Sequence, residues 1–265
     1  MSADPSSVTP PSDDELMPLL ADLFAPLENL GPGQPEATRH ALALAQGAIP
    51  HPIATIADLG CGTGRSGRLL ARETKAQILC VDMLPTLITA VRGRAAQAGL
   101  DHRITAVVGD MLSPPIPAGT MDLIWCESAI YAVGVPAALK AWAPLLADGG
   151  CVAFSEAVKR VESLDPAVED FFAADGVTLH HTDVLLASVR EARWQVVGHF
   201  PLPLEAWSQH YYEPLAARLP DFLSAHRNNP AARALVDALT AEIDLHDRFG
   251  ETYGYHFVVC KVGER

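Results

Sequence analysis

The stretch Asp58-Leu-Gly-Cys-Gly-Thr-Gly64 closes an apolar run that begins at Ile53. The run contains β-branched residues and stops at three closely spaced glycines, after which residues 65–72 resume with a helix-compatible composition. This order predicts a β-strand, a tight turn and a helix. Glycine has no Cβ atom, so a ligand can lie directly against the backbone of such a turn. The stretch is therefore predicted to bind a ligand.

A second apolar run spans residues 76–81 and ends in Asp82. This acid follows Gly62 by about 20 positions, the interval at which nucleotide-binding α/β proteins place an acid on the ribose hydroxyls. The glycine turn and the acid together indicate a cofactor that contains a nucleoside.

Asp58 bears on which cofactor that is. A dinucleotide would place its pyrophosphate against the turn, where a carboxylate repels it. S-adenosylmethionine carries a positive sulfonium and an ammonium, which a carboxylate attracts. The segment Gly62-Thr-Gly-Arg-Ser-Gly67 also matches the dinucleotide pattern G-x-G-x-x-G, so a nicotinamide cofactor remains the alternative. That match begins two residues late relative to the strand end, and glycines 60 to 64 fit a G-x-G-x-G turn better.

Five segments occur together in the order and spacing of one enzyme family. They are 58–64, Val81-Asp82, Gly109-Asp-Met111, Asp122-Leu-Ile-Trp-Cys-Glu127 and Leu145-Leu-Ala-Asp-Gly-Gly-Cys-Val-Ala-Phe-Ser155. As a set, over roughly residues 35 to 200, they resemble the class I S-adenosylmethionine-dependent methyltransferases. Segments 125–134 and 206–212 are also similar to a bacterial subgroup of uncharacterised small-molecule methyltransferases, a likeness that names no substrate.

The resemblance implies how the strand ends would hold the nucleoside. Asp82 would accept hydrogen bonds from the ribose hydroxyls, and Met83 would pack on the adenine. Asp110, after Gly109 in the same motif, would accept from the adenine amino group, and Met111 would donate its backbone N–H to the ring. Acids at strand ends also cap the helices that follow, so a capping role stays open for Asp82 and Asp110.

At the methionine end, the resemblance implies that Gly60 and Gly62 let the amino-acid portion lie close to the backbone. Glu127 would line the route from the cofactor to the methyl acceptor. The expected cofactor-binding residues of the turn are Asp58, Gly60, Cys61, Gly62 and Gly64. Cys61 is expected to be a small filler and not a nucleophile, because no paired histidine can be identified from the sequence.

The composition limits the class of substrate. The chain has 265 residues, a net charge of −13 and 49% hydrophobic residues, enough for the core of one large α/β domain. Its average field would repel a phosphate backbone, so nucleic acid is not expected as a partner. Nucleic-acid amino-methyltransferases resemble one another in an Asn- or Asp-Pro-Pro-aromatic motif, where this chain has Cys126-Glu-Ser-Ala129.

Five scattered cysteines without a C-x-x-C motif suggest a reduced cytoplasmic interior. Neither the cysteines nor the ten histidines cluster at zinc-ligand spacing, so no metal is expected. No apolar run reaches the roughly 18 residues of a membrane span, and no membrane association is expected. The oligomeric state stays open, and a homodimer is one alternative.

Apolar runs near residues 53–59, 76–82, 103–109, 121–127 and 151–157 predict strands separated by helical stretches of ten or more residues, with two further strands at 194–200 and 253–262. The predicted fold is therefore α/β: a doubly wound, Rossmann-like, seven-stranded, mostly parallel sheet with helices on both faces. Residues 1–12 are expected to form a disordered arm, and residues 13–265 a single domain.

Roughly fifty residues separate the last two predicted strands, far beyond the usual connection of about 2–6 residues. We expect a helical cap insertion at about 203–250, over the strand ends. Its aromatic residues Trp207, Tyr211 and Tyr212 either receive a cationic or planar acceptor or simply pack the cap.

The sequence thus predicts an S-adenosylmethionine-dependent methyltransferase that acts on a small-molecule acceptor. Methyl transfer from a sulfonium depends mainly on alignment and a dry site, and a base matters only for a protonated acceptor. The catalytic candidates are Glu127, Tyr131 and His210. The alternatives are an NAD(P)-dependent oxidoreductase and a non-catalytic protein that binds S-adenosylmethionine.

Overall fold

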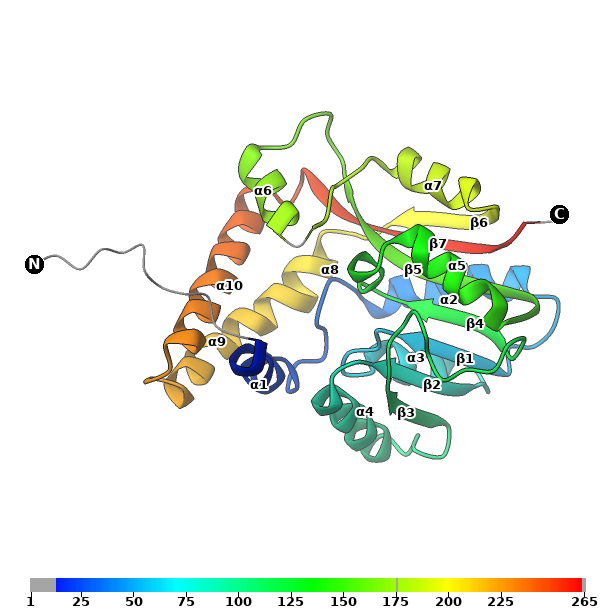
Figure 1. Ribbon diagram of the computed structural model, residues 1–265, viewed down its shortest axis with the longest axis horizontal. Coiled ribbons are helices and arrows are strands. Elements are labelled where there is room, and N and C mark those ends of the chain that lie inside the picture. Colours follow the sequence, from blue (N-terminus) through cyan, green and yellow to red (C-terminus); the bar gives the residue numbers. More distant parts are fainter. Residues whose placement is uncertain (1–12, 175, 264–265) are drawn as a thin grey trace, which may run out of the picture.

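The centre of the protein is a seven-stranded sheet in the order β3-β2-β1-β4-β5-β7-β6 (Figure 1). The computed structural model describes residues 13–174 and 176–263. The strands, in sheet order, are β3 (Ile104–Val108), β2 (Gln77–Asp82), β1 (Thr55–Leu59), β4 (Met121–Cys126), β5 (Leu146–Lys159), β7 (Tyr253–Val262) and β6 (Trp194–Pro201). Strand β7 runs antiparallel to both of its neighbours, whereas β1 to β5 pair in parallel. The predicted Rossmann-like, mostly parallel sheet is confirmed.

The central strands are buried on both faces, as expected for a parallel sheet covered by helices on each side. In β1, Ile56 belongs to one core cluster and Ala57 to the other. Trp125 and Ile124 divide in the same way in β4. The alternation follows from the two-residue period of a strand.

Helices cover the two faces unequally (Figure 1). Helices α2 (Pro35–Ala48), α3 (Arg65–Glu73) and α4 (Pro85–Gln97) share the core cluster of Ile56. Helices α5 (Val135–Trp142) and α7 (Thr182–Glu191) share the other, and the short 3₁₀ turns η1 (Ile130–Ala132) and η2 (Ala143–Leu145) flank α5. Proline stands in the first turn of α2, α4 and α5, where its missing N–H costs no hydrogen bond.

The predicted insertion between β6 and β7 is helical. It consists of α8 (Glu205–Trp207), the π-helical turn η3 (Ser208–Tyr212), α9 (Glu213–Ala225) and α10 (Pro230–Phe249), which together we call the cap. Helix α1 (Asp13–Phe24) packs on α9 and α10, and α6 (Pro166–Ala174) packs on α10. These helices gather at one end of the sheet, on the left of Figure 1. No helix in the described ranges has both the length and the hydropathy to cross a bilayer.

One prediction about the connections is wrong. A helical stretch was expected between every two of the first five strands, but residues 109–120, between β3 and β4, form turns and irregular backbone. Pro114, Pro115 and Pro117 remove backbone donors there, and Gly119 has a φ of +70°. Residues 1–12, expected as a disordered arm, lie outside the described ranges, and the assignment of residues 13–265 to a single domain stays a prediction.

Candidate active site

The glycine turn after β1 depends on left-handed backbone at three alternate residues. Gly60, Gly62 and Gly64 have φ values of +70°, +53° and +76°, in the region where side chains with a Cβ are strained. A Cβ added at Gly60 would also lie 2.6 Å from the Cβ of Ala129. The turn is fastened to β2, because the N–H of Gly60 donates to the carbonyl of Val81 over 2.9 Å. Only glycine therefore fits this turn without rearrangement.

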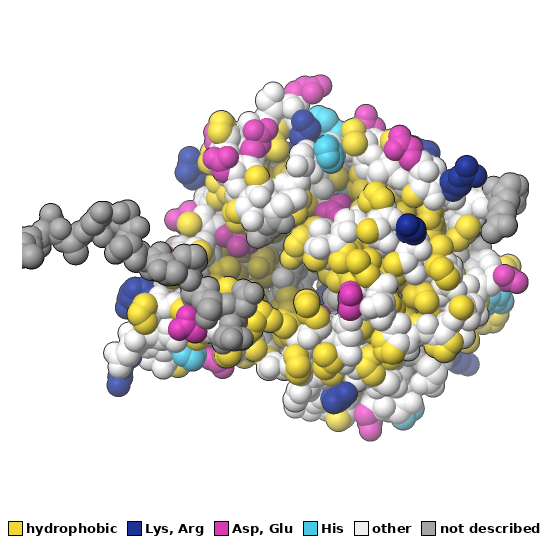
Figure 2. Space-filling model, in the orientation of Figure 1, with side chains coloured by type: hydrophobic (Ala, Val, Ile, Leu, Met, Phe, Trp, Pro, Cys, Tyr) yellow, Lys and Arg dark blue, Asp and Glu magenta, His cyan; other side chains and the backbone are white. Residues whose placement is uncertain are grey.

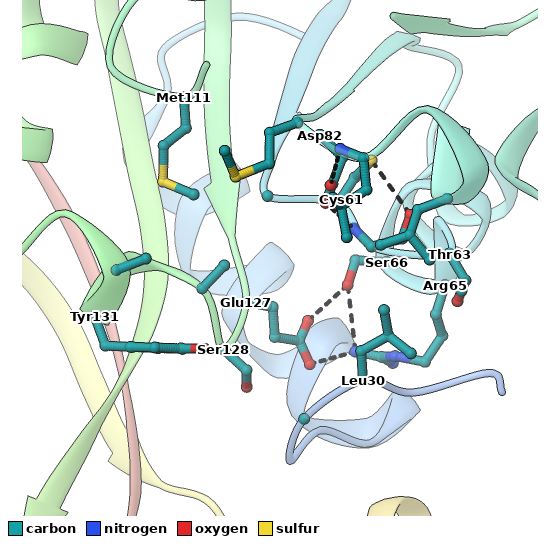
Figure 3. Close-up of a pocket in the computed structure, with 18 of the residues that line it drawn as sticks. Leu30, Cys61, Thr63, Arg65, Ser66, Asp82, Met111, Glu127, Ser128 and Tyr131 are labelled. Atoms are coloured by element: carbon teal, nitrogen blue, oxygen red, sulfur yellow. Dashed lines mark hydrogen bonds and ion pairs between the residues drawn. The ribbon is translucent and has the colours of Figure 1, made fainter. Parts of the chain in front are cut away.

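Asp82 connects the end of β2 to the middle of that turn. Its Oδ2 accepts from the N–H of Gly62 over 2.9 Å, and its Oδ1 accepts from the N–H of Leu84 over 3.0 Å (Figure 3). Burial raises the pKa of Asp82, against the effect of the N–H groups of Leu84 and Gly62, which favour the carboxylate. Asp82 thus stabilises the start of α4 and the turn together.

Asp58 lies behind the turn and not in the cavity in front of it. Its side chain is 1% exposed, and its Oδ2 has no hydrogen-bond partner among the described residues. Burial, followed by the nearby negative charge of Glu127, raises the pKa of Asp58 to about 7. Arg65 and the backbone N–H of Gly67 oppose this shift. Asp58 can therefore act on a ligand through its field but not by direct contact.

A large cavity of about 640 Å³ opens at the carboxyl ends of β1 to β4 (Figure 3). Open parallel sheets bind ligands at this edge. The predicted site residues that line it are Gly60, Cys61, Gly62, Asp82, Met83, Gly109, Asp110, Met111, Glu127 and Tyr131. Met83, 72% exposed, stands at its rim with Leu112 and Met17, and Figure 2 shows hydrophobic side chains around the hollow.

Charges in the large cavity are predominantly negative. Four carboxylates line it, from Glu28, Asp82, Asp110 and Glu127, and Arg65 is the only cationic side chain among the described lining residues. Arg65 is paired with Glu127 in a contact whose side chains are 13% and 4% exposed. The cavity therefore suits a positively charged ligand and would repel a pyrophosphate.

Glu127 is held by several donors at once (Figure 3). Besides Arg65, the hydroxyls of Ser66 and Thr38 donate to its Oε2 over 3.1 and 3.0 Å, and the indole N–H of Trp125 does so over 3.2 Å. These bonds occupy the lone pairs of the carboxylate. Glu127 therefore holds Arg65 and Ser66 in position.

Residues 28–33, which we call the cover loop, lie across the glycine turn. The hydroxyl of Thr63 donates to the carbonyl of Glu28 over 2.8 Å, and the hydroxyl of Ser128 donates to the carbonyl of Pro32 over 2.5 Å. The side chain of Leu30 packs on Gly62, where an added Cβ would meet its Cδ1 at 3.1 Å. The loop is also tied to the cap, since the N–H of Gly33 donates to the carbonyl of Ala206. It closes the cavity on the side of the cap.

A smaller cavity of about 90 Å³, the inner cavity, lies between the cover loop and the cap. It shares Leu30, Gly31, Pro32, Ser128 and Tyr131 with the large cavity. Its remaining wall comes from the cap, α6 and the sheet: Ala157, Phe171, Phe172, Val177, Trp207, Tyr211, Glu242 and Tyr255. The sharing of these walls makes the inner cavity the natural position for a second reactant.

The π-helical turn η3 explains how the cap presents so many aromatic rings inward. In a π-helix residue i is aligned with residue i+5, so Trp207 comes over Tyr212, with ring centroids 5.4 Å apart in a stacked arrangement. Tyr211 remains on the same side, and all three side chains are buried. Such turns are frequent at functional sites.

A third cavity, the side cavity of about 340 Å³, adjoins the inner one through Tyr131, Ala157 and Val177. It contains Glu156, whose pKa burial raises to about 7. Tyr131 is 43% exposed and lines all three cavities. In Figure 3 it lies on the opposite side of the open space from Arg65. It is the catalytic candidate that the structure places between the two possible reactants.

Three predicted site residues do not line these cavities. Asp58 is behind the turn, Gly64 packs on Val91, and His210 lies on the half-buried outer part of η3. The sequence did not single out the cover loop, Ser128, Glu242 or Tyr255. The motif Gly31-Pro-Gly-Gln-Pro35, a rigid loop before the first strand, is the signal that could have suggested a cover.

Residues 56–150 match the family model described as a methyltransferase domain. Residues 56–150 therefore form a methyltransferase domain. The matched range runs from β1 into β5 and includes the glycine turn, Asp82, Asp110 and Glu127, so the family resemblance predicted from the sequence is confirmed. The cover loop and the cap lie outside the match, as expected if they adapt the methyltransferase domain to an individual acceptor.

Curated relatives match parts of the chain. A probable chloroplastic tocopherol O-methyltransferase from Oryza sativa subsp. japonica is 37% identical over 71 residues, which are 27% of this chain and 20% of the relative. Methyltransferase GfsG from Streptomyces halstedii is 28% identical over 142 residues, 52% of this chain and 51% of the relative. The chain therefore covers no more than about half of either relative's length.

Similarity to a solved structure extends over nearly the whole chain. The crystal structure of an S-adenosylmethionine-dependent methyltransferase from Geobacter sulfurreducens, in complex with S-adenosyl-L-homocysteine, superposes with a TM-score of 0.79. The two sequences are 19% identical, and the match covers 92% of this chain and 98% of that one. The fold is thus shared over nearly the whole chain at low sequence identity.

Proposed function

We propose that this protein transfers a methyl group from S-adenosylmethionine to a small-molecule acceptor. The observation that carries the proposal is the charge of the large cavity. Of the four carboxylates among its described lining residues, Glu127 is paired with Arg65 and Glu28 with Arg68, whereas Asp82 and Asp110 have no ion pair with a described residue. A cationic cofactor is favoured there and a pyrophosphate is not. The relative from Geobacter sulfurreducens, crystallised with S-adenosyl-L-homocysteine, supports the same ligand class.

The residues present fit this cofactor. Asp82 lies in the cavity wall, where its carboxylate can accept from a ribose hydroxyl while it holds Gly62 and Leu84. Met83 and Leu112 are exposed apolar side chains at the rim, and an adenine ring placed between them would remove both from water. Asp110 is exposed at the same rim and its Oδ1 accepts the N–H of Leu112 over 2.8 Å, which leaves Oδ2 for an amino group.

When bound, the cofactor supplies an electrophilic methyl group on a sulfonium. Gly60 and Gly62 let the amino-acid portion approach the backbone, and the carboxylates that line the cavity provide the negative field around it. The cover loop excludes water from the boundary between the large and inner cavities, where Ser128 and Tyr131 lie. Alignment and exclusion of water supply most of the acceleration expected for such a displacement.

A calorimetric titration tests the proposal. We expect S-adenosylhomocysteine to bind and NADH not to bind, and a screen of small-molecule acceptors with S-adenosylmethionine to yield S-adenosylhomocysteine. Binding of NADH alone would establish the oxidoreductase alternative. Tight binding of S-adenosylhomocysteine without turnover on any acceptor would favour the non-catalytic alternative.

The remaining partner and compartment assignments belong to the same proposal. The negative field of the cavity and of the chain makes nucleic acid an unsuitable acceptor. All five cysteines are free and buried, which suits the reducing cytoplasm. Homodimer formation is tested by light scattering.

A further inference from the structure

The inner cavity has a composition that ordinary packing does not require. Six of its lining side chains are aromatic, namely Tyr131, Phe171, Phe172, Trp207, Tyr211 and Tyr255, and one is a carboxylate, Glu242. None of its described lining residues is a lysine, arginine or histidine. Glu242 is half-buried at this wall, where the hydroxyl of Tyr212 donates to its Oε1, and its carboxylate adds a negative charge to the ring of aromatic side chains.

From this composition we propose that the acceptor is a small aliphatic amine, which enters the inner cavity as its ammonium. Aromatic faces attract cations, and a desolvated cation is attracted most strongly. Glu242 supplies the counter-charge. This inference rests on the proposed methyltransferase function and names the substrate class of the same site.

The protonation states of the cavity walls support this choice. Burial, and then the charge of Glu242, raises the pKa of Tyr211 and of Tyr212 far above neutrality. The phenols therefore stay neutral, and the hydroxyl of Tyr212 donates to Oε1 of Glu242 over 2.8 Å. This bond fixes the carboxylate at the wall of the inner cavity.

The charge of the inner cavity favours an ammonium over other acceptor classes. Its volume of about 90 Å³ suits a small aliphatic ammonium group. A carboxylate acceptor would face Glu242 and find no cation to pair with. A longer amine can extend into the side cavity, where Glu156 adds a second acidic group.

The reaction requires the free base of the amine. A sulfonium in the large cavity lowers the pKa of a neighbouring ammonium, since two positive charges disfavour each other. The ammonium gives one proton to the Glu242 carboxylate, and the nitrogen lone pair then forms a bond to the methyl carbon. As the carbon–sulfur bond breaks, its electron pair stays on sulfur, so the products are a neutral thioether and a methylated ammonium.

Binding of a simple cation tests the site without any turnover. Tetramethylammonium and tert-butanol have the same number of non-hydrogen atoms and similar shapes but differ in charge. By calorimetry at constant ionic strength, we expect the wild-type protein to bind tetramethylammonium at least tenfold more tightly than tert-butanol. Equal affinity for the two probes, or no binding of tetramethylammonium, would overturn the proposal.

Glu242→Gln should abolish most of this preference. Asp244→Asn, which removes one charge from an exposed position of the same helix, is the matched control and should retain it. If Glu242→Gln does not fold, Tyr255→Leu replaces it, with the expectation of a weakened preference for the cation. An unchanged preference in the folded variant contradicts the assignment of Glu242.

The cation site and the methyltransferase function can fail separately. Titration with S-adenosylhomocysteine tests the cofactor site and should give the same affinity in Glu242→Gln as in the wild type. With S-adenosylmethionine present, primary and secondary aliphatic amines should yield S-adenosylhomocysteine, and phenols and carboxylic acids should not. Turnover of phenols or carboxylic acids without turnover of amines would disprove the amine assignment and leave the methyltransferase function standing.

Discussion

The carboxylate of Asp82 accepts the backbone N–H of Gly62 over 2.9 Å, so the end of β2 fixes the centre of the glycine turn. Asp82→Ala should weaken S-adenosylhomocysteine binding by about 1–3 kcal/mol, roughly five- to 150-fold, because the ribose hydroxyls and the Gly62 N–H all lose a partner. Calorimetry measures the affinity, and a thermal melt verifies that the variant is folded. An unchanged affinity would remove the ribose assignment.

The ion pair between Arg65 and Glu127 should behave as a buried pair. Glu127→Ala leaves the arginine, 13% exposed, without its counter-charge and should lower the free energy of unfolding by about 3–5 kcal/mol. The double variant Arg65→Met/Glu127→Gln should lose less, because neither charge is left alone. Urea unfolding distinguishes the two cases. If the double variant loses as much unfolding free energy as the sum of the losses in Arg65→Met and Glu127→Gln measured separately, the two residues do not interact.

Asp58 makes the stability of the ligand-free protein depend on pH. Its folded-state pKa of about 7 lies above the ordinary value of 3.8, so the folded protein holds a proton that the unfolded chain releases. The associated stability is complete below about pH 4 and is lost as the pH rises to about 7, by up to roughly 4 kcal/mol in total. Asp58→Asn should therefore gain stability relative to the wild type over this range and change no further above it. Urea unfolding at several pH values measures the difference, and Asp244→Asn should show none.

A comparison of two glycines with positive φ distinguishes the cost of backbone strain from the cost of steric crowding around an added Cβ. Gly99 has a φ of +67° and an added Cβ would meet nothing within 4 Å, whereas at Gly64, with φ +76°, it would lie 2.9 Å from Cγ1 of Val91. Gly99→Ala should cost about 1–2 kcal/mol from the left-handed conformation alone. Gly64→Ala should cost a further ~1–3 kcal/mol from overpacking. Equal losses in urea unfolding would show that Val91 moves aside freely.

Removal of the Tyr211 side chain should separate acceptor turnover from cofactor binding. Tyr211 lines the inner cavity and not the large one, so Tyr211→Ala should reduce kcat/KM by roughly tenfold or more and leave the affinity for S-adenosylhomocysteine unchanged. His210→Ala, one residue away and outside the cavity lining, is the control and should retain both. A loss of turnover in His210→Ala with normal cofactor binding would instead support the catalytic role that the sequence predicts for His210.

The parts of the site that the sequence predicted are local. Gly60, Gly62 and Asp82 follow strands that can be recognised in the sequence as apolar runs. The turn and the acid both lie within a few residues of the ends of those strands. The spacing of about 20 residues between Gly62 and Asp82 is imposed by one strand–helix–strand unit, which is why it is visible without a structure.

The parts that the sequence could not predict depend on contacts between distant segments. In the sequence Arg65 is visible only as the first residue of a helix, and its pairing with Glu127 requires that β1 and β4 be neighbours in the sheet. Glu242 reaches the inner cavity through the packing of α10 against α9, which helical periodicity alone does not define. The inward rotation of Tyr212 results from a π-helical turn, which has no reliable sequence signature.

The cap leaves the sheet after Pro201 and returns just before its paired partner His256, so its two ends lie side by side on adjacent antiparallel strands. An insertion anchored in this way can be lengthened, shortened or exchanged without any change in the path of β1 to β4. Recognition of the acceptor can thus diverge in evolution while the nucleoside-binding part of the sheet is preserved. Grafting the cap between related proteins is therefore a practical route to altered selectivity for the acceptor.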